Sequence, residues 1–509
     1  MKKARIFLTL AVTAVLLCLS ISAADFEKSR VYQNNFSDVP ETSWYAGSVA
    51  SVYEIELMEG VSEDEFDVDS EMSVAQAITI AARLHSIYND TEIPDVQGGR
   101  WFQKYVDYCV KNKIMRSGQF NSYSRSVLSY EMVELFAAAL PNEFYPAINN
   151  ITAICDVPIA LDFADDVLLF YNAGILNGND ADGTFLPMSA ITRKRASVIL
   201  SRTALSENRL KFTLPSPKDE YTSQEILKLI DKQTVKDTLD GIVLASYDGY
   251  KVTAAEYRYY SFISDGDNKK TENEIRFAIA AEMCIKEANL KVSRKDYEDI
   301  LISYYSPRTS DYGDTSYFDA LDNIRLTDAA FAKMIALNKL NYLALAEECS
   351  NISNDDVYKY ALENDYICAS HILIAGDTDN AYRKALEIYI SLSNGEDFDK
   401  LLKKYGQDPG LHGRSGGYIF TRGWMVKGFE DAAYETKEGE ISSIVETEYG
   451  YHIIKRLTFD KQVLVSSPDY VSVAINAGTE KFNVKVAEKQ GKVKLEYIEN
   501  FDGLSEILK

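Results

Sequence analysis

The sequence predicts a multidomain chain with three parts: a triplicated all-α region, a mainly α-helical middle region and an α+β domain. At 509 residues, the chain is too long for a single hydrophobic core. Three segments in the first two hundred residues share one helical plan. Residues 355–460 instead switch between strand-like and helix-like periodicity, which separates them from the repeats.

The charge and the cysteine content argue against some partners and some kinds of site. The formal net charge is −23, which argues against a nucleic-acid binder because phosphates would be repelled. The cysteines that follow residue 24 are scattered and show no paired spacing, so we expect neither a disulfide framework nor a zinc site.

Residues 1–24 read as a secretory signal peptide. Basic residues come first, an apolar run of about a dozen residues follows, and small residues Ser22 and Ala24 precede Asp25. A single membrane anchor is the alternative, although the run is short for a span. No later stretch is long and apolar enough to cross a bilayer, so we predict a secreted protein without a membrane span after signal removal.

Asp38, Asp95 and Asp156 mark three copies of one pattern, in residues 32–90, 91–145 and 150–206. Each copy has an apolar residue, Asp-Val, an aromatic residue, a helix of period near 3.6 and a glycine stop. A second amphipathic helix follows in each copy. A repeat of roughly 60 residues predicts helical modules that bury their apolar faces against one another.

These copies resemble S-layer homology (SLH) domains, most closely through "GILNGNDADGTFLPMSAITRKRAS" in the third copy. The resemblance implies attachment to cell-wall polysaccharide, with Arg193 contacting the glycan. A guanidinium suits such a contact, because it offers a fixed fork of hydrogen-bond donors to a carboxylate of the polysaccharide. The first two copies read "MSVAQ" and "LSYEM" at the matching place and carry no arginine there. A purely helical spacer is the alternative.

The middle of the chain shows no catalytic spacing. Residues 207–238 read as a linker containing one helix, "SQEILKLIDKQT". Residues 239–350 begin with a strand, an Asp-Gly turn, a second strand and an N-cap at Thr253, and continue as helices. This order resembles the N-terminal chaperone segment of PrsA- and SurA-type foldases. The same resemblance implies that residues 461–509 return to this region and complete one discontinuous domain.

His371 lies in the middle of a predicted buried strand, "CASHILIAG". Alternation places it on one face with Ile367, Ala369 and Leu373. A second strand, "EYGYHIIKRL", carries His452 in a similar position. A buried imidazole needs a hydrogen-bond partner. If the two strands are antiparallel neighbours, we expect the two imidazoles to bond each other.

Residues 355–460 resemble the parvulin family of peptidyl-prolyl cis/trans isomerases, through "ASHILI", "YGQDPG", "RGWMVKGFEDAAY", "KEGEIS" and "YGYHIIKR". The resemblance implies a four-stranded antiparallel sheet surrounded by helices. It also implies isomerisation of X-Pro bonds in unfolded or newly exported polypeptides, without metal, cofactor or covalent intermediate. The loop "GGYIFTRGWM" is shorter than the family's usual loop, which predicts an open wall on one side of the pocket.

The family's site residues carry over to seven positions of this sequence. The predicted catalytic positions are His371, Asp408, His452 and Tyr449, the last as a hydroxyl on the final strand. The predicted proline pocket is formed by Leu373, Met425 and Phe429. His412, in a glycine-rich loop, is expected to be solvated. The histidines could instead be a purely structural pair, and Met425 and Phe429 could be plain core.

Together these features predict a secreted foldase held at the cell wall, with an isomerase domain and a chaperone region. The alternative is a non-catalytic wall-bound chaperone or surface-layer protein whose parvulin-like domain is inactive.

Overall fold

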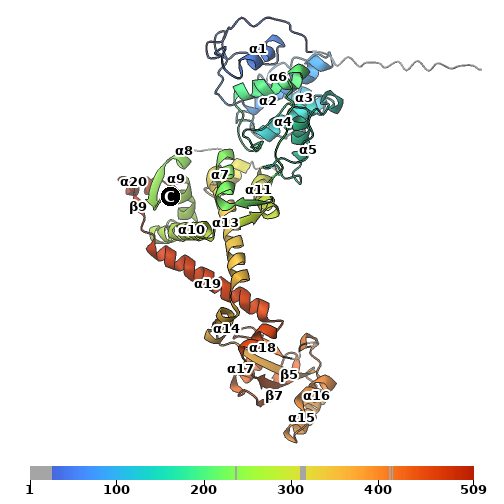
Figure 1. Cartoon of the computed structure of the whole chain (residues 1–509), viewed down its shortest axis with the longest axis vertical. Coiled ribbons are helices and arrows are strands. Elements are labelled where there is room, and N and C mark those ends of the chain that lie inside the picture. The colour runs from blue at the N-terminus through green and yellow to red at the C-terminus, as the bar shows by residue number, and fades with distance from the viewer. Residues whose placement is uncertain (1–25, 235–237, 310–316, 412–413, 415, 509) are drawn as a thin grey trace, which may run out of the picture. The chain divides into compact units, whose positions relative to one another are not determined.

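The computed structural model describes residues 26–234, 238–309, 317–411, 414 and 416–508 (Figure 1). The predicted signal peptide and His412 lie outside the described residues. The chain divides into two compact units: Met1–Tyr221, Glu225–Asp237 and Ser293–Lys333 form the first, and Thr222–Gln224, Thr238–Val292 and Met334–Lys509 form the second. Within the described ranges, no helix has the length and apolar character needed to cross a membrane.

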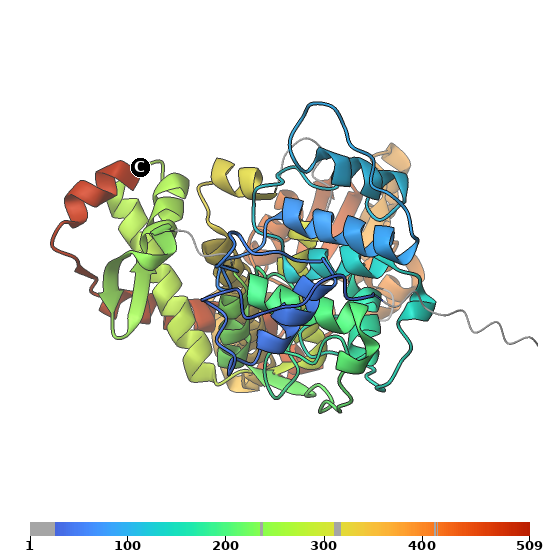
Figure 2. The same cartoon turned by 90° about the horizontal axis from the view of Figure 1, so that it is seen from above.

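Each repeat of the first unit contributes two helices, which lie together in both ribbon views (Figures 1 and 2). The first helix of every repeat packs on the second helix of another repeat: α3 on α2, α5 on α4, and α1 on α6. The three repeats thus close into a ring. Their helices are α1 (Ala46–Glu54), α2 (Val74–Tyr88), α3 (Gln103–Lys111), α4 (Ser129–Ala139), α5 (Ala164–Asn172) and α6 (Arg193–Ala204), with 3-10 turns at Asn142–Phe144 and Ser206–Asn208.

A cyclic set of backbone hydrogen bonds joins the three repeats just before their second helices. Met72 N–H donates to the Ile191 carbonyl (2.8 Å), Ile191 N–H to Val127 (3.3 Å), and Val127 N–H to Met72 (2.8 Å). Each residue is the apolar one that precedes the helix start in its repeat. The three copies are therefore equivalent in space, which confirms the helical repeat predicted from the sequence.

The aspartate that marks each repeat does not have the same environment in all three copies. Asp38 accepts the N–H groups of Phe66 (2.8 Å) and Val68 (3.0 Å). Asp156 accepts those of Phe185 (2.8 Å) and Leu186 (2.7 Å) in the same way. Asp95 is 88 % exposed and pairs with a lysine instead. The first loop is thus fixed by a half-buried carboxylate and the third by a buried one, and the second loop is not fixed in this way.

Other helices complete the first unit. Tyr305 donates its hydroxyl to Gln233 Oε1 (3.0 Å) and lies 3.3 Å from the Asp156 carbonyl, so α7 and α11 pack against the third repeat. Part of the region predicted as residues 239–350 therefore groups with the repeats. The elements are β1 (Glu220–Thr222), α7 (Ser223–Gln233), β4 (Lys291–Ser293), α11 (Arg294–Thr309), α12 (Tyr317–Asn323) and the start of α13 (Asp328–Asn351).

The second unit begins with a small sheet that joins distant parts of the chain. Thr253 caps α9 through a capping box with Glu256, as predicted. Near the end of the chain, β9 pairs with β2 through Ala245 and Tyr497, and Phe501 contacts Tyr257 edge to face. The elements are α8 (Thr238–Gly241), β2 (Val243–Tyr247), β3 (Tyr250–Thr253), α9 (Ala254–Ile263), α10 (Asn268–Ala288), β9 (Glu496–Tyr497) and α20 (Phe501–Leu508).

A long helix, α19 (Tyr470–Lys492), packs against both α10 and α14 (Asn354–Glu363), and α18 (Lys461–Ser466) precedes it. It passes α13 at Gly478, where a Cβ atom would lie 2.6 Å from Cys349 Cα and Sγ. Only glycine permits this approach, so the crossing depends on one residue.

The rest of the second unit contains the predicted four-stranded antiparallel sheet. Its strands lie in the order β6-β5-β8-β7. Helices α15 and α16 cover the face that carries Ile372 and Ile374, and α17 covers the face that carries Ile367 and Ala369. The predicted alternation in β5 is confirmed. The elements are β5 (Ile367–Ala375), α15 (Asp379–Ser393), α16 (Phe398–Tyr405), a 3-10 turn (Pro409–Leu411), β6 (Tyr418–Phe420), α17 (Lys427–Glu435), β7 (Ile441–Thr447) and β8 (Gly450–Leu457).

Candidate active site

His371 and His452 lie side by side in the centre of the sheet and are both buried. Their rings meet edge to face, with centroids 5.0 Å apart. The prediction that they hydrogen-bond each other is wrong, because the strand register places Leu373 opposite His452 and Ile454 opposite His371. The histidines are therefore diagonal neighbours. Nε2 of His452 bonds Thr447 Oγ1 instead (2.7 Å).

Burial lowers the pKa of His452 to about 4, with repulsion from His371 as the next cause. Burial also lowers the pKa of His371, against the attraction of Asp408. Both imidazoles are consequently neutral near pH 7. This is the form that an apolar setting favours, because no charge has to leave water.

Asp408 lies beside His371, held by contacts from three segments. Its Oδ2 is 3.2 Å from His371 Nε2 and accepts the Tyr418 hydroxyl at 2.8 Å. Its Oδ1 accepts the Gly410 N–H at 2.8 Å. The predicted site carboxylate is therefore next to the histidine pair.

Phe429 forms the apolar floor of the same site. Its ring contacts His371 (5.0 Å) and His452 (5.4 Å) edge to face, and Met425 packs against the same cluster. The buried Glu430 carboxylate accepts the N–H groups of Gly423 (2.7 Å) and Met425 (3.4 Å). This carboxylate ties the loop that carries Met425 to α17. Leu373 lies on the same sheet face, opposite His452.

The predicted hydroxyl on the last strand is replaced by a residue that sequence reasoning missed. Tyr449 is 58 % exposed in the turn between β7 and β8, where its N–H donates to Thr447 Oγ1. Thr447, not Tyr449, supplies the hydroxyl that bonds His452. A two-residue turn at 448–449 was the available signal, because it places Thr447 on the face of His452.

Arg193, the predicted glycan contact, is buried in the first unit. Its Nε donates to the Phe66 carbonyl (2.7 Å) and its Nη2 to the Glu59 carbonyl (2.6 Å), while Cζ lies 4.7 Å from the centre of the Phe66 ring. The guanidinium thus joins the third repeat to the loop of the first. A contact with glycan stays a prediction.

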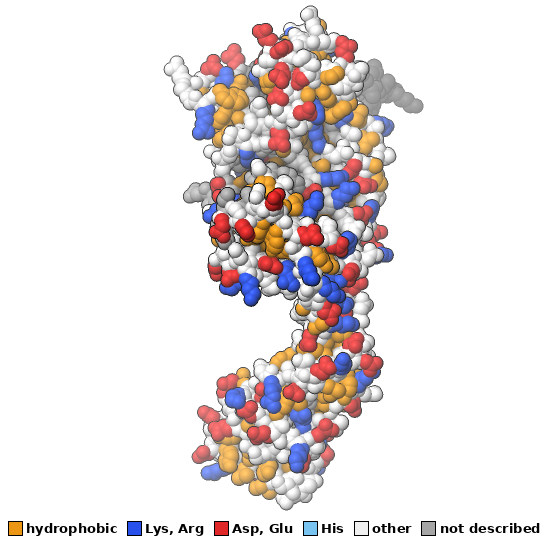
Figure 3. Space-filling view, turned by 90° about the vertical axis from the view of Figure 1, so that its left-hand side faces the viewer, with side chains coloured by type: hydrophobic (Ala, Val, Ile, Leu, Met, Phe, Trp, Pro, Cys, Tyr) orange, Lys and Arg blue, Asp and Glu red, His pale blue; other side chains and the backbone are white. Residues whose placement is uncertain are grey.

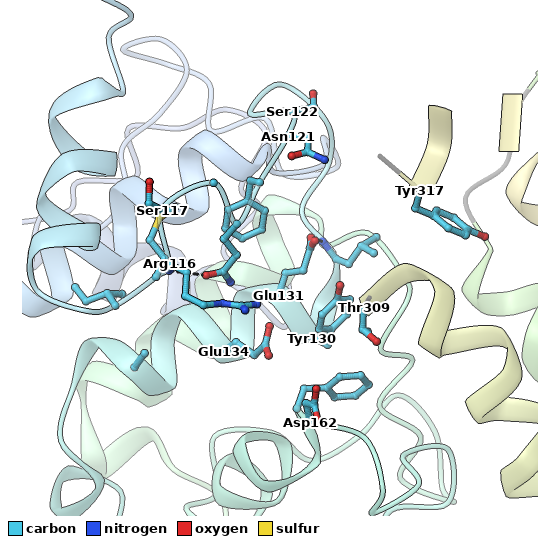
Figure 4. Close-up of a pocket in the computed structure, with 18 of the residues that line it drawn as sticks. Arg116, Ser117, Asn121, Ser122, Tyr130, Glu131, Glu134, Asp162, Thr309 and Tyr317 are labelled. Atoms are coloured by element: carbon cyan, nitrogen blue, oxygen red, sulfur yellow. Dashed lines mark hydrogen bonds between the residues drawn. The ribbon is translucent and has the colours of Figure 1, made fainter. Parts of the chain in front are cut away.

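A cavity of about 940 Å³ is lined by the second repeat, by the start of the third repeat and by residues of α11 and α12 (Figure 4). Glu131, Glu134 and Asp162 lie around it, together with Arg116. Arg125 also lines it and forms a two-point ion pair with Glu131 (2.5 and 2.9 Å). Burial, followed by nearby carboxylates, raises the pKa of Glu134 to about 7. Carboxylates outnumber basic side chains among the charged residues that line the cavity, and apolar residues form much of the rest.

Comparisons with known proteins match one segment in each of the two units. Residues 357–460 match the PPIC-type PPIASE domain, and residues 35–78 match the S-layer homology domain. A search of solved structures matches the solution structure of NmPin, the parvulin of Nitrosopumilus maritimus, with 42% sequence identity. The match covers 18% of this chain and 96% of NmPin, and its TM-score is 0.16.

Two curated relatives are foldases. The chain is 42% identical over 124 residues to the foldase protein PrsA of Geobacillus kaustophilus, covering 24% of this chain and 42% of that protein. It is 31% identical over 231 residues to the foldase protein PrsA 2 of Listeria monocytogenes, covering 42% of this chain and 75% of that protein. The match thus spans less than half of the first relative and three quarters of the second. On this likeness, the chain belongs to the PrsA foldase family.

Proposed function

We propose that this protein is a secreted foldase, anchored at the cell wall, that catalyses cis/trans isomerisation of X-Pro bonds in exported polypeptides. One observation carries the proposal: an apolar floor and a fixed carboxylate lie on the same two neutral histidines. Phe429 and Met425 form the floor, and Asp408 supplies the carboxylate. Such a site is apolar enough for a proline ring and polar enough for an amide.

The chemistry asks for little from these residues. Rotation about the X-Pro bond faces a barrier of about 18–20 kcal/mol because of amide resonance. A site lowers it by binding the twisted amide better than either planar form. In the proposal the proline ring lies against Phe429, Met425 and Leu373. Asp408 and the histidines, with Thr447 fixing His452, form the polar side.

The remaining parts of the chain serve this site in two ways. The helical part of the second unit, closed by β9 and α20, holds unfolded clients. The repeats bind wall polysaccharide, for which the cavity beside α4 is the candidate place because carboxylates accept hydrogen bonds from sugar hydroxyls. The face in Figure 3 carries acidic and basic side chains interspersed, and it shows no broad basic area of the kind that attracts nucleic acid.

Isomerisation of short X-Pro peptides by the full chain tests the activity. Phe429→Ala and Met425→Ala should each lower kcat/KM at least tenfold, because the ring loses its apolar contacts. Ile390→Ala is the matched control, since Ile390 is exposed on α15, which covers the opposite sheet face. A folded wild-type chain that accelerates no peptide would favour the alternative, a non-catalytic wall-bound chaperone.

A further inference from the structure

Tyr418, within the short loop "GGYIFTRGWM", lies beside the candidate site. Its ring stacks on His371, with centroids 6.1 Å apart and planes 27° apart. Its hydroxyl donates to Asp408 Oδ2, the oxygen that also faces His371 Nε2. With Gly410 N–H on Oδ1, both oxygens of the carboxylate have a donor.

The chain is shaped to permit this contact. A Cβ atom at Gly410 would lie 2.0 Å from the Tyr418 hydroxyl, so any larger residue would displace it. Tyr418 pairs with Ala369 of β5, and the following residue, Ile419, donates its N–H to Asp469 (2.9 Å). Backbone contacts on β6 thus fix the ring in place, and its position does not depend on Asp408 alone.

The chemistry of the pair is that of a neutral donor and a charged acceptor. Burial, and then the hydrogen bond to Asp408, raise the pKa of Tyr418, so its phenol keeps its proton. Arg414 Cζ lies 5.2 Å from the centre of the ring, and its guanidinium pairs with Asp469 (2.5 Å). A hydrogen bond to an ionised group is stronger and more directional than a neutral one.

We propose that Tyr418 is a positioning residue that holds the Asp408 carboxylate in its orientation beside the X-Pro amide. The proposal rests on the proposed isomerase function. It assigns Tyr418 no contact with the reacting bond, and it predicts that Tyr418 acts only while Asp408 is present.

A double-mutant cycle in the full chain tests this role. Tyr418→Phe keeps the ring and removes the hydroxyl, so kcat should fall about tenfold, as expected for losing a hydrogen bond to a charged group, while KM changes less than twofold. In the Asp408→Ala background the same change should have no effect. Full activity of Tyr418→Phe, or an equal loss in both backgrounds, would overturn the proposal.

A second variant reaches the same contact from the other side. Gly410→Ala should reduce kcat as much as Tyr418→Phe does, because the added methyl displaces the hydroxyl. Combined with Tyr418→Phe, it should cause no further loss. Additive losses would overturn the proposal. A wild-type chain without activity would instead refute the proposed function, so the two failures are distinguishable.

Discussion

Thr447 and His452 are joined across the β7–β8 hairpin by a 2.7 Å hydrogen bond between Oγ1 and Nε2. The bond satisfies one nitrogen of an imidazole that is almost wholly buried. The orientation of the histidine, and hence of one side of the candidate site, depends on a hydroxyl two residues before the exposed Tyr449.

Thr447→Val should therefore weaken the local structure of β8. The substitution keeps the shape of the side chain but leaves a buried imidazole nitrogen without its partner, at a cost of about 1–3 kcal/mol. Hydrogen exchange of residues 450–457 in the full chain measures this loss. Thr447→Ser, which keeps the hydroxyl, is the matched control, and equal exchange in the two variants would contradict the prediction.

The histidine pair should make the second unit sensitive to mild acid. The folded pKa of His452 is lowered to about 4 from 6.5, so the unfolded chain binds the proton that the folded chain refuses. The free energy of unfolding therefore has its full value, as far as these histidines are concerned, above about pH 6.5. It decreases as the pH falls toward 4, by up to ~1.4 kcal/mol per pH unit for each such histidine.

Urea denaturation at several pH values between 7 and 4 measures this slope. His452→Gln removes one titrating group, so the variant should lose less stability over the same range. If wild type and variant show the same pH dependence, acid sensitivity comes from other groups and the prediction is wrong.

The sequence predicted the sheet and the faces of its strands because a period of two leaves little freedom once one face is buried. It placed His371, Leu373 and His452 on one face correctly. It could not give the register between strands separated by roughly 80 residues, since alternation fixes the face and not the opposite residue. The supposed bond between the histidines failed for this reason.

The sequence also does not predict contacts that residues make across loops. The Tyr418–Asp408 bond depends on the space left by Gly410, and no periodicity describes it. The repeat predicted three equivalent modules, but it could not show that Asp95 lies exposed while its counterpart Asp156 is buried. Such differences arise from packing and not from local pattern.

The aspartates of the repeats give a matched test within one chain. Asp156→Ala should destabilise the third loop by about 2 kcal/mol or more, because two backbone N–H groups lose a buried acceptor. Asp95→Ala removes only an exposed ion pair with Lys104, so it should change the stability much less than Asp156→Ala does. Hydrogen exchange of residues 177–190 measures the first effect, and the prediction fails if Asp156→Ala leaves that exchange unchanged.

Substitution of Arg193 tests whether this residue anchors the protein to the wall or stabilises the first unit. Arg193→Gln should increase hydrogen exchange in residues 59–66, because the loop of the first repeat loses two donors to its carbonyl groups and a cation above the Phe66 ring. Lys194→Gln is the matched control, since it removes only the neighbouring ion pair with Asp69. Binding of the full chain to purified cell walls is measured alongside. If Arg193→Gln weakens wall binding while exchange stays at the wild-type level, the guanidinium contacts the glycan directly and the structural prediction is wrong. If exchange rises and wall binding persists, the arginine serves the ring of repeats, and the glycan site lies elsewhere in the first unit.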